Sequence, residues 1–504
     1  MEQLLSLLKT IPEYAAMVSS LQGGESVAVT GIGQINRSHM IAGLCRSLSR
    51  PMVVLCQDDL AARRLQEELK GFLSDTAPIL PGRDLTLYDA AVVSRSWEQK
   101  RLRQLYDLAA GKTNLQIMTW ESLSLRTMPK AALLSAAFSL EVGREYAVED
   151  LTSRLTAAGY NRCGMVEGPG QFAVRGGILD IFSPAEDQPV RAEFFGDELD
   201  TMGFFDPATQ RRSENITSVT VLPVAETQPG LHPGGVEGLC RDISSLISRQ
   251  KRRKNINEPL IATLEKDLNK YESGLHNPAS DRYMALIYPE MATAADYIPD
   301  GAVVAVCDHG NLQRAARSRC DEMGMQLDSM LGAGLVAGEL CDYVSQWEDF
   351  CKTLRRKTVV YFDAFGGTSY PEDCPPRQLY PLTAKQLPGY GGNLDTAVAD
   401  LSHYQKMEFG SLVLCGTRRR AELLQQLLHE KGLSAFLCIP LTTLPKPGQI
   451  LLTEGTLPFG MEYPLSKIAV LTEGQLIARG EPKRKPAKKT GSTNRQKLNS
   501  FTDL

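Results

Sequence analysis

Residues 31–38, with the sequence GIGQINRS, have the spacing of a phosphate-binding loop but only part of its chemistry. Such a loop reads G-x-x-x-x-G-K-[ST], where the second glycine lets backbone amides approach the phosphates and the lysine pairs with them. Here Asn36 replaces that glycine and Arg37 replaces the lysine. Because arginine is a larger, planar cation, it is not an equivalent replacement. We interpret the segment as a vestigial nucleotide loop made of Gly31, Gly33, Asn36, Arg37 and Ser38.

A working nucleotide site also needs an acidic residue at the end of a neighbouring strand to hold the metal ion. Three apolar runs end in such a residue, at Asp58, Asp308 and Asp363. None continues into the Asp-Glu pair typical of helicase-type motors, and aspartate commonly starts a turn after a strand. We therefore predict no catalytic residue and no nucleotide hydrolysis by this chain.

The cysteines and histidines form no metal-binding pattern. The 11 cysteines include no C-x-x-C pair, and the six histidines are dispersed along the chain. We predict no metal site and no cofactor. Thiols placed mostly within apolar runs fit a reducing compartment, which makes a cytoplasmic protein the expectation. Because no run of 18 or more apolar residues occurs, we expect no membrane-spanning segment.

Charge is distributed unevenly along the 504 residues. Residues 480–497 carry seven Lys or Arg against Glu481, so this segment has a net charge of +6 and the remainder has −10. An acidic body does not by itself indicate DNA binding, which needs a basic face. The composition of the segment predicts an extended linker.

Several patterns predict the domain organisation. Strand-like and helical segments alternate from about residue 24 to 120, which favours a parallel sheet covered by helices. Expected strands include PMVVLCQD (51–58), which reads as buried, and LQIMTWESL (115–123), and DLAARRLQEELKGFLS (59–74) is an expected amphipathic helix. Further along, residues 411–433 are expected to form a strand, a turn and a helix. Short strands with Gly turns follow, which favours an inserted α+β domain of antiparallel hairpins. The predicted segments are 1–125 and 216–351 for the first α/β domain, 126–215 for the insertion, 352–478 for a third, small α/β domain, and 479–504 for the basic linker.

The strand VRAEFF (190–195) is the best candidate for a recognition surface. Its alternation places Val190, Ala192 and Phe194 on one face and Arg191, Glu193 and Phe195 on the other. An aromatic beside charged groups is typical of an interface, because arginine and aromatic residues anchor binding hot spots. In FAVRGG, Arg175 alternates outward in the same way.

Four longer segments carry a resemblance to a known family. They are RDLTLYDAAVVSRSWEQKRLRQLYDL (83–108), LTAAGYNRCGMVEGPGQFAVRGGILDIFSP (155–184), PVRAEFFGDELDTMGFFDPATQRR (189–212) and LLTEGTLPFGMEYPLSKIAVLTEGQL (451–476). Through these segments the chain resembles the N-terminal part of the bacterial transcription-repair coupling factors, over residues 20–504. The first domains of that family are similar to those of the excision-nuclease subunit UvrB. The implied fold is a UvrB-like, degenerate RecA-type domain with an inserted interaction domain.

The resemblance also implies partners. The insertion is similar to the UvrB domain that docks UvrA, and Arg175, Arg191 and Phe195 match the family's UvrA-contacting positions. In full-length members, a basic linker leads to a module that binds RNA polymerase and then to a motor that uses ATP and magnesium to translocate on double-stranded DNA. Those modules lie beyond the segments found here, so the resemblance implies a recruiting module that also restrains the motor of the full-length protein.

Other functions are alternatives. A UvrB-like or helicase-like ATP- and DNA-binding enzyme would use Arg37 in place of lysine. A DNA-binding protein would act through the tail at 480–497, and the basic run 251–254 is a weaker phosphate-binding signal. The carboxylates at 197–200 suggest a hydrolase, but no histidine or metal-ligand spacing accompanies them.

A clamp on DNA is a further alternative, because UvrB grips DNA with an aromatic hairpin in its first domain. The corresponding stretch here has Tyr88 and Trp97 but no tyrosine-rich insertion. The basic residues that follow are more typical of a solvated helix face; they are Arg95, Lys100, Arg101 and Arg103.

Overall fold

The protein is described by a computed structural model covering residues 2–89, 96–365, 369–390 and 393–476. Two compact units make up the chain. The first holds residues 1–386 and 463–466, and the second holds 387–462 and the residues from 467 onward. Both units are mixed α/β. The segment 479–504, predicted to be a linker, lies outside the described residues.

A parallel sheet forms the centre of the first unit, with the strand order β14-β1-β13-β12-β2-β3. Its strands are β1 (Val27–Ile32), β2 (Met52–Cys56), β3 (Leu115–Thr119), β12 (Val303–Cys307), β13 (Thr358–Asp363) and β14 (Gln378–Leu387). Every residue of β2, β12 and β13 is buried. Continuous apolar runs such as MVVLC are what a parallel sheet covered on both faces requires.

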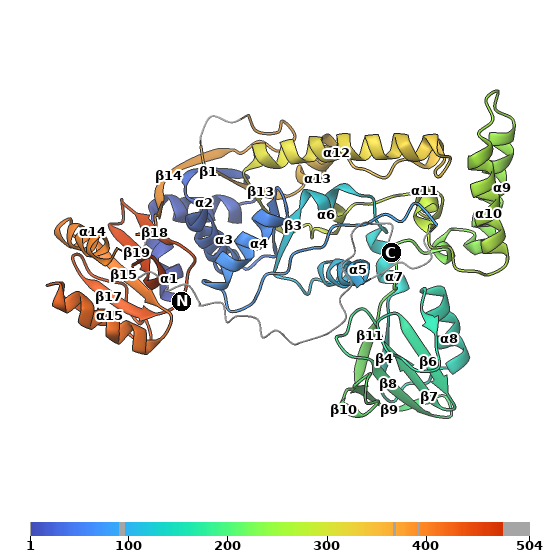
Figure 1. Ribbon diagram of the computed structural model, residues 1–504, viewed down its shortest axis with the longest axis horizontal. Helices are drawn as coiled ribbons and strands as arrows, with labels where there is room; N and C mark the ends of the chain where they lie inside the picture. Colours follow the sequence, from blue (N-terminus) through green and yellow to red (C-terminus); the bar gives the residue numbers. More distant parts are fainter. Residues whose placement is uncertain (1, 90–95, 366–368, 391–392, 477–504) are drawn as a thin grey trace, which may run out of the picture. The chain divides into compact units, whose positions relative to one another are not determined.

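Helices of the first unit connect and flank these strands (Figure 1). They are α1 (Glu2–Ser6), α2 (Pro12–Gln22), α3 (Gln34–Leu48), α4 (Asp59–Lys70), α5 (Ser96–Ala109), α6 (Trp120–Ser124), α7 (Lys130–Ala136), α9 (Gly235–Lys251), α10 (Glu258–Glu272), α11 (Met284–Ile287), α12 (His309–Gly332) and α13 (Trp347–Leu354). Short 3₁₀ turns occur at Leu7–Thr10, Pro229–Leu231, Ser280–Tyr283, Ala294–Tyr297 and Gly338–Leu340. The helix predicted for 59–74 is present as α4, which ends at Lys70 and begins where the Asp58 side chain accepts a hydrogen bond from the Ala61 amide at 2.8 Å.

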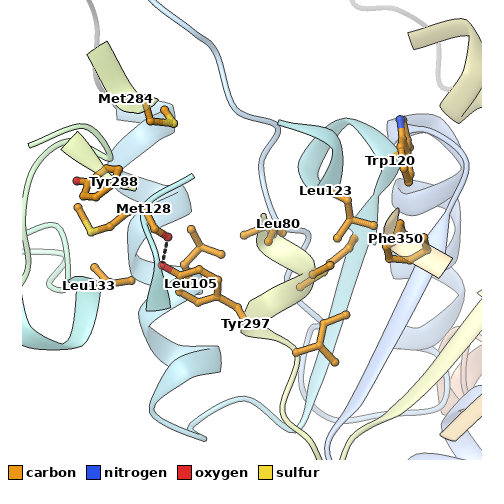
Figure 2. Packing of buried hydrophobic residues seen from close by; sticks show 14 of the residues in the cluster. Leu80, Leu105, Trp120, Leu123, Met128, Leu133, Met284, Tyr288, Tyr297 and Phe350 are labelled. Carbon is orange, nitrogen blue, oxygen red and sulfur yellow. Dashed lines mark hydrogen bonds between the residues drawn. The ribbon is translucent and has the colours of Figure 1, made fainter. Parts of the chain in front are cut away.

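Figure 2 shows part of the core that these elements enclose. Trp120 packs edge-on against Phe350, with ring centroids 5.6 Å apart. Tyr297 is fully buried and donates its hydroxyl hydrogen to the Met128 carbonyl oxygen at 2.8 Å, so its polar end is satisfied within the apolar cluster. This core holds segments from residue 28 to residue 374 in one body.

An antiparallel, hairpin-rich region interrupts the first unit, as the short strands and Gly turns predicted. Its six-stranded sheet has the order β10-β9-β8-β7-β6-β5, and a two-stranded sheet pairs β4 with β11. The elements are β4 (Phe138–Glu141), α8 (Val148–Ala157), β5 (Asn161–Arg162), β6 (Gln171–Arg175), β7 (Ile178–Ile181), β8 (Val190–Phe195), β9 (Glu198–Phe205), β10 (Arg212–Asn215) and β11 (Ser218–Val221). Leu151 and Leu155 of α8 pack on one face of the larger sheet.

The second unit is built around the parallel strands β16, β17, β15 and β19, in that order, followed by β18. Its elements are α14 (Leu394–Lys406), β15 (Gly410–Cys415), α15 (Arg418–Glu430), β16 (Ala435–Leu437), β17 (Ile450–Glu454), β18 (Gly460–Tyr463), β19 (Ile468–Thr472) and α16 (Glu473–Leu476). The predicted strand-turn-helix at 411–433 is present as β15 and α15.

Three expectations need correction. The strand predicted at 115–123 ends at Thr119, because Thr119 and Ser122 form a reciprocal hydrogen-bonded cap that starts α6. The third domain predicted from 352 begins later, at Leu387, since β13 lies between β1 and β12 in the first sheet. The insertion does not end at 215, because β11 pairs with β4 from its opposite end.

Candidate functional site

The larger antiparallel sheet has one apolar face and one polar face. Register pairs Asp180 of β7 with Arg191 of β8, and Arg191 with Gly203 of β9, so these residues share a face. The opposite face carries Leu179, Ala192 and their neighbours in the apolar core. We call the first side the polar face and define it by Arg175, Asp180, Arg191, Glu193, Phe195, Thr201 and Arg212.

Two arginines on the polar face share one buried carboxylate. Arg175 Nη2 lies 2.7 Å from Asp180 Oδ2, while Arg191 Nε and Nη2 lie 2.7 and 2.9 Å from the two Asp180 oxygens. The Asp180 side chain is 1% exposed, whereas that of Arg175 is 50% exposed. The structure thus brings together Arg175 and Arg191, which the sequence singled out separately.

Arg191 is held more tightly than its strand position suggested. Its guanidinium also donates to the Gln210 carbonyl and side-chain oxygens at 3.4 and 3.2 Å, and it lies 4.6 Å above the Phe205 ring. The hydrogen bonds to Asp180 raise the pKa of Arg191, so it stays charged at any physiological pH. Its side chain is only 18% exposed.

A second charge pair continues the polar face. Arg212 Nη1 lies 3.3 Å from Glu193 Oε1 and 3.2 Å from the Thr201 hydroxyl. Gly203 leaves room for this arginine, because a Cβ at that position would lie 2.5 Å from Arg212 Nε. The polar face therefore alternates positive and negative groups across its strands, with three arginines against two carboxylates.

Phe195 is the exposed aromatic at the end of this face. It is 84% exposed and stands opposite Glu198, beside the turn in which Gly196 has φ +64°. Regular alternation along β8 directs Phe194 toward the apolar core and leaves Phe195 in solvent, while the register shift at this point places an extra residue, Asp200, in β9. An isolated phenylalanine this exposed, next to an arginine-rich surface, is the composition of a protein-binding hot spot.

The carboxylates at 197–200 lie in the same hairpin without forming a catalytic arrangement. Asp197, Glu198 and Asp200 are exposed, and Glu198 forms an isolated bridge with Glu145 through the backbone. Among the residues that the structure describes, no group of three or more His, Cys, Asp or Glu side chains could hold a metal ion.

In the segment 31–38, most of the vestigial loop belongs to a helix. α3 begins at Gln34, and the Arg37 amide already donates to the Gly33 carbonyl at 3.0 Å. Strand β14 passes close by: a Cβ on Gly31, whose φ is +77°, would lie 2.2 Å from the Leu382 carbonyl oxygen. One residue, Gly33, therefore separates β1 from α3, where a phosphate-binding loop has several.

Side chains of the vestigial loop are engaged with the protein itself. Arg37 Nη1 lies 2.6 Å from Asp308 Oδ2, and the buried Ser38 hydroxyl donates to Glu68. Burial alone would lower the pKa of Arg37, but Cys307 and Asp308 outweigh it and the pKa is raised. Burial raises the pKa of Glu68, which is 2% exposed. Asn36 is fully buried.

Asp363, one of the three strand-end acids, is paired elsewhere. Its carboxylate oxygen lies 2.9 Å from His309 Nδ1, and Asp58 caps α4. Of the three, Asp308 alone contacts the vestigial loop. That contact was not foreseen, because a tertiary contact over 271 residues leaves no periodic signal in the sequence.

The charges after residue 95 are not all solvated, which corrects the expectation for this helix. Arg101 is fully buried; its Nε lies 3.0 Å from Glu226 Oε1, at the end of the insertion. Trp97 and Tyr88 are exposed, and Lys100 lies 5.3 Å from the Trp97 ring centroid. Arg95 lies outside the described residues. The basic run 251–254 is exposed, and Lys251 and Arg253 pair with Glu265 and Glu339.

In the second unit, two strand ends share the sequence LTEG and the same role. Glu454, the last residue of β17, accepts a hydrogen bond from the Arg418 amide at 2.6 Å, and Glu473, directly after β19, accepts one from the Gly416 amide at 3.1 Å. Both carboxylates thus cap the turn that leads into α15. A pocket of about 360 Å³ lies at these strand ends, lined in part by Thr456, Phe459 and Gln475.

Two comparisons with known proteins bear on this chain. The family model of the UvrB interaction domain matches residues 138–226, which contain the polar face. The whole chain is 23% identical to the transcription-repair-coupling factor of Bacillus subtilis over 510 residues, which is 100% of the chain and 42% of that protein. It is 24% identical to that of Staphylococcus haemolyticus and 25% to that of Staphylococcus aureus MRSA252, over 96% of the chain and 40 and 41% of those proteins.

The expected resemblance is confirmed: the chain carries a UvrB interaction domain and is similar along its length to transcription-repair-coupling factors. It spans about two-fifths of the length of these relatives. Within the described part of the chain, no helix is both long and apolar enough to cross a membrane.

Proposed function

We propose that this chain recruits UvrA, and with it nucleotide excision repair, through the polar face of its UvrB interaction domain. One observation carries the proposal: Arg175, half exposed, and Phe195, 84% exposed, occupy one face of the domain matched by that family. The similarity to transcription-repair-coupling factors supports a role in coupling repair to transcription.

The chemistry of the face suits a protein partner. Arginine can hold a carboxylate through two parallel hydrogen bonds, and an exposed phenylalanine gains free energy by entering an apolar pocket. Because Arg175 is half exposed, a partner surface that places a carboxylate opposite this arginine fits best. UvrA would contact Arg175 and Phe195 directly.

Nucleotide chemistry is the weaker alternative. In the Arg37–Asp308 pair the arginine side chain is 14% exposed and the aspartate side chain 33% exposed, so the arginine is the more deeply buried partner and its charge is already paired. A carboxylate repels phosphate groups, and β14 lies against Gly31 where a cradling loop would need space. In this proposal the first unit is a UvrB-like, degenerate RecA-type domain that holds no ATP and catalyses no hydrolysis.

Further roles belong to the longer proteins that the chain resembles. RNA polymerase binding, ATP-driven translocation on double-stranded DNA and restraint of the motor would be properties of the full-length protein, to which this chain contributes the recruiting module. The basic residues 480–497 would link it to the rest.

Calorimetric titration of this chain with purified UvrA tests the proposal. We expect binding at micromolar or lower concentration, weakened about tenfold by Arg175→Ala, as for loss of one charged anchor. Arg162→Ala is the matched control, because Arg162 is exposed but pairs with Phe172 on the other face. No heat of binding by the unaltered chain, or equal losses for the two variants, would overturn the proposal.

A further inference from the structure

The two arginines beside Asp180 differ in how many of their guanidinium N–H donors remain free for a partner. Arg191 uses four of the five N–H donors of its guanidinium, two on Asp180 and two on Gln210. Its side chain also covers the Phe205 ring. A partner approaching the sheet finds little of Arg191 available.

Arg175 leaves most of its donors free. Only Nη2 is bonded, to Asp180 Oδ2, and the Nε and Nη1 atoms have no hydrogen-bond partner among the described residues. With half its side chain exposed, Arg175 would otherwise sample many rotamers, and fixing such a long side chain on binding costs up to about 2 kcal/mol of conformational entropy. The bond to Asp180 imposes much of that order before a partner arrives.

Asp180 is well placed to hold Arg175 in one orientation. It lies on the central strand β7, is 1% exposed, and is gripped by two nitrogens of Arg191. Ala173 stands opposite it on β6, so no side chain of comparable size competes for the space between Asp180 and Arg175. Arg191 stabilises the buried charge of this carboxylate, and Asp180 Oδ2 still accepts a hydrogen bond from Arg175.

We propose that Asp180 is a positioning residue of the polar face: it pre-orients Arg175 for a partner carboxylate, and Arg191 supports Asp180 instead of contacting the partner. This inference rests on the proposed docking of UvrA and adds a residue that the sequence did not single out. It also reassigns Arg191 from a contact to a support.

A thermodynamic cycle on UvrA affinity tests this arrangement in the full chain. Asp180→Asn preserves size, and we expect it to weaken binding about tenfold, as does Arg175→Ala. If Asp180 acts through Arg175, the double variant stays about tenfold weaker than the unaltered chain, because the two losses are the same loss. A loss near a hundredfold, the product of the two, would overturn the inference.

A second variant keeps the test decisive if Asp180→Asn unfolds. Arg191→Gln leaves Asp180 paired with Arg175, and we expect a loss clearly smaller than that of Arg175→Ala, about threefold. An equal or larger loss in a variant with an unchanged melting temperature would show that Arg191 contacts the partner and would overturn the reassignment.

The positioning role of Asp180 can also be measured in the absence of UvrA. Nuclear magnetic resonance of arginine Nε–Cζ groups should show slow rotation of the Arg175 guanidinium in the unaltered chain and fast rotation in Asp180→Asn. Equal rotation in both would overturn the inference. Absence of UvrA binding together with the expected rotation would instead overturn the proposed function alone.

Discussion

Two Arg–Asp pairs in the first unit use the same chemistry in opposite orientations. In the vestigial loop, Arg37 is 14% exposed and its partner Asp308 is 33% exposed, with a separation of 2.6 Å. On the polar face, Arg175 is 50% exposed and its partner Asp180 is 1% exposed, with a separation of 2.7 Å. In the first pair the arginine is the more deeply buried partner, and in the second pair the aspartate is.

The difference shows that burial decides what a charged pair can recognise. An arginine whose charge and donors are turned into the protein stabilises the fold and offers nothing to a phosphate. An arginine tethered by a buried carboxylate keeps free donors and is already ordered, which lowers the entropic cost of binding. The same two residue types thus stabilise the fold in the vestigial loop and, in the function we propose, present an arginine to a partner on the polar face.

Arg37→Ala removes the Arg37–Asp308 ion pair of the vestigial loop, and we expect it to have the largest effect of these substitutions. Removing the arginine leaves Asp308 without its cation and opens a gap around the buried stem, which should lower the free energy of unfolding by about 2–3 kcal/mol. A thermal melt should show a clear decrease in melting temperature.

Arg46→Ala is the control for this melt, because Arg46 lies on the same helix α3 and is exposed. UvrA affinity should be unchanged in both variants. A melting temperature for Arg37→Ala within error of the control would mean that the Arg37–Asp308 pair does not stabilise the vestigial loop.

Phe195→Ala tests the polar face. Because Phe195 is 84% exposed, its removal should leave the melting temperature unchanged while UvrA binding weakens by about 2 kcal/mol, or roughly 30-fold. Leu134→Ala, at a 40% exposed position on α7, is the control for loss of an exposed apolar side chain. Calorimetry that gave the same affinity for both variants would contradict a hot spot at Phe195.

His39 lies on α3 beside the vestigial loop and makes the stability of the fold depend on pH. Its Nε2 lies 2.9 Å from the Leu4 carbonyl oxygen and must donate to it, so Nδ1 accepts from the Tyr463 hydroxyl at 2.8 Å. Burial lowers the pKa of His39 to about 4. Because the unfolded chain has the ordinary pKa near 6.5, it binds the proton more readily than the folded chain does.

The stability contributed by neutral His39 is therefore complete above about pH 6.5 and is lost as the pH falls toward 4. Between pH 7.5 and pH 5 this loss should amount to about 2 kcal/mol. His39→Gln should remove that part of the slope when denaturant unfolding is followed at both pH values. An unchanged slope would show that His39 does not titrate on unfolding.

Local patterns predicted much of this fold. The apolar run MVVLC predicted a buried strand, the spacing of 59–74 predicted the helix that is present as α4, and alternation in VRAEFF separated Ala192 from Arg191 correctly. The strand expected at 115–123 failed at Thr119, where a hydrogen-bonded cap outweighed the β propensity of the residues after it.

The sites were less predictable than the elements. Strand alternation placed Arg175, Arg191 and Phe195 outward, and the family resemblance selected them; their role in binding UvrA stays a prediction. Asp180 gave a weaker local signal. It is a lone aspartate within ILDIF, where a buried carboxylate needs a charged or hydrogen-bonding partner. Arg101 was expected in solvent and is buried, because its partner Glu226 is distant in sequence.

The sequence alone determined the residue types and periods: a loop without the second glycine and the lysine of a phosphate-binding motif, and strands of alternating side chains. Only the tertiary structure decided which end of each charged pair faces solvent. That choice depends on what packs around the pair, here Asp308 against Arg37 and the β7–β8 register around Asp180. Exposure is a property of neighbours that come together in space, so no single stretch of sequence encodes it.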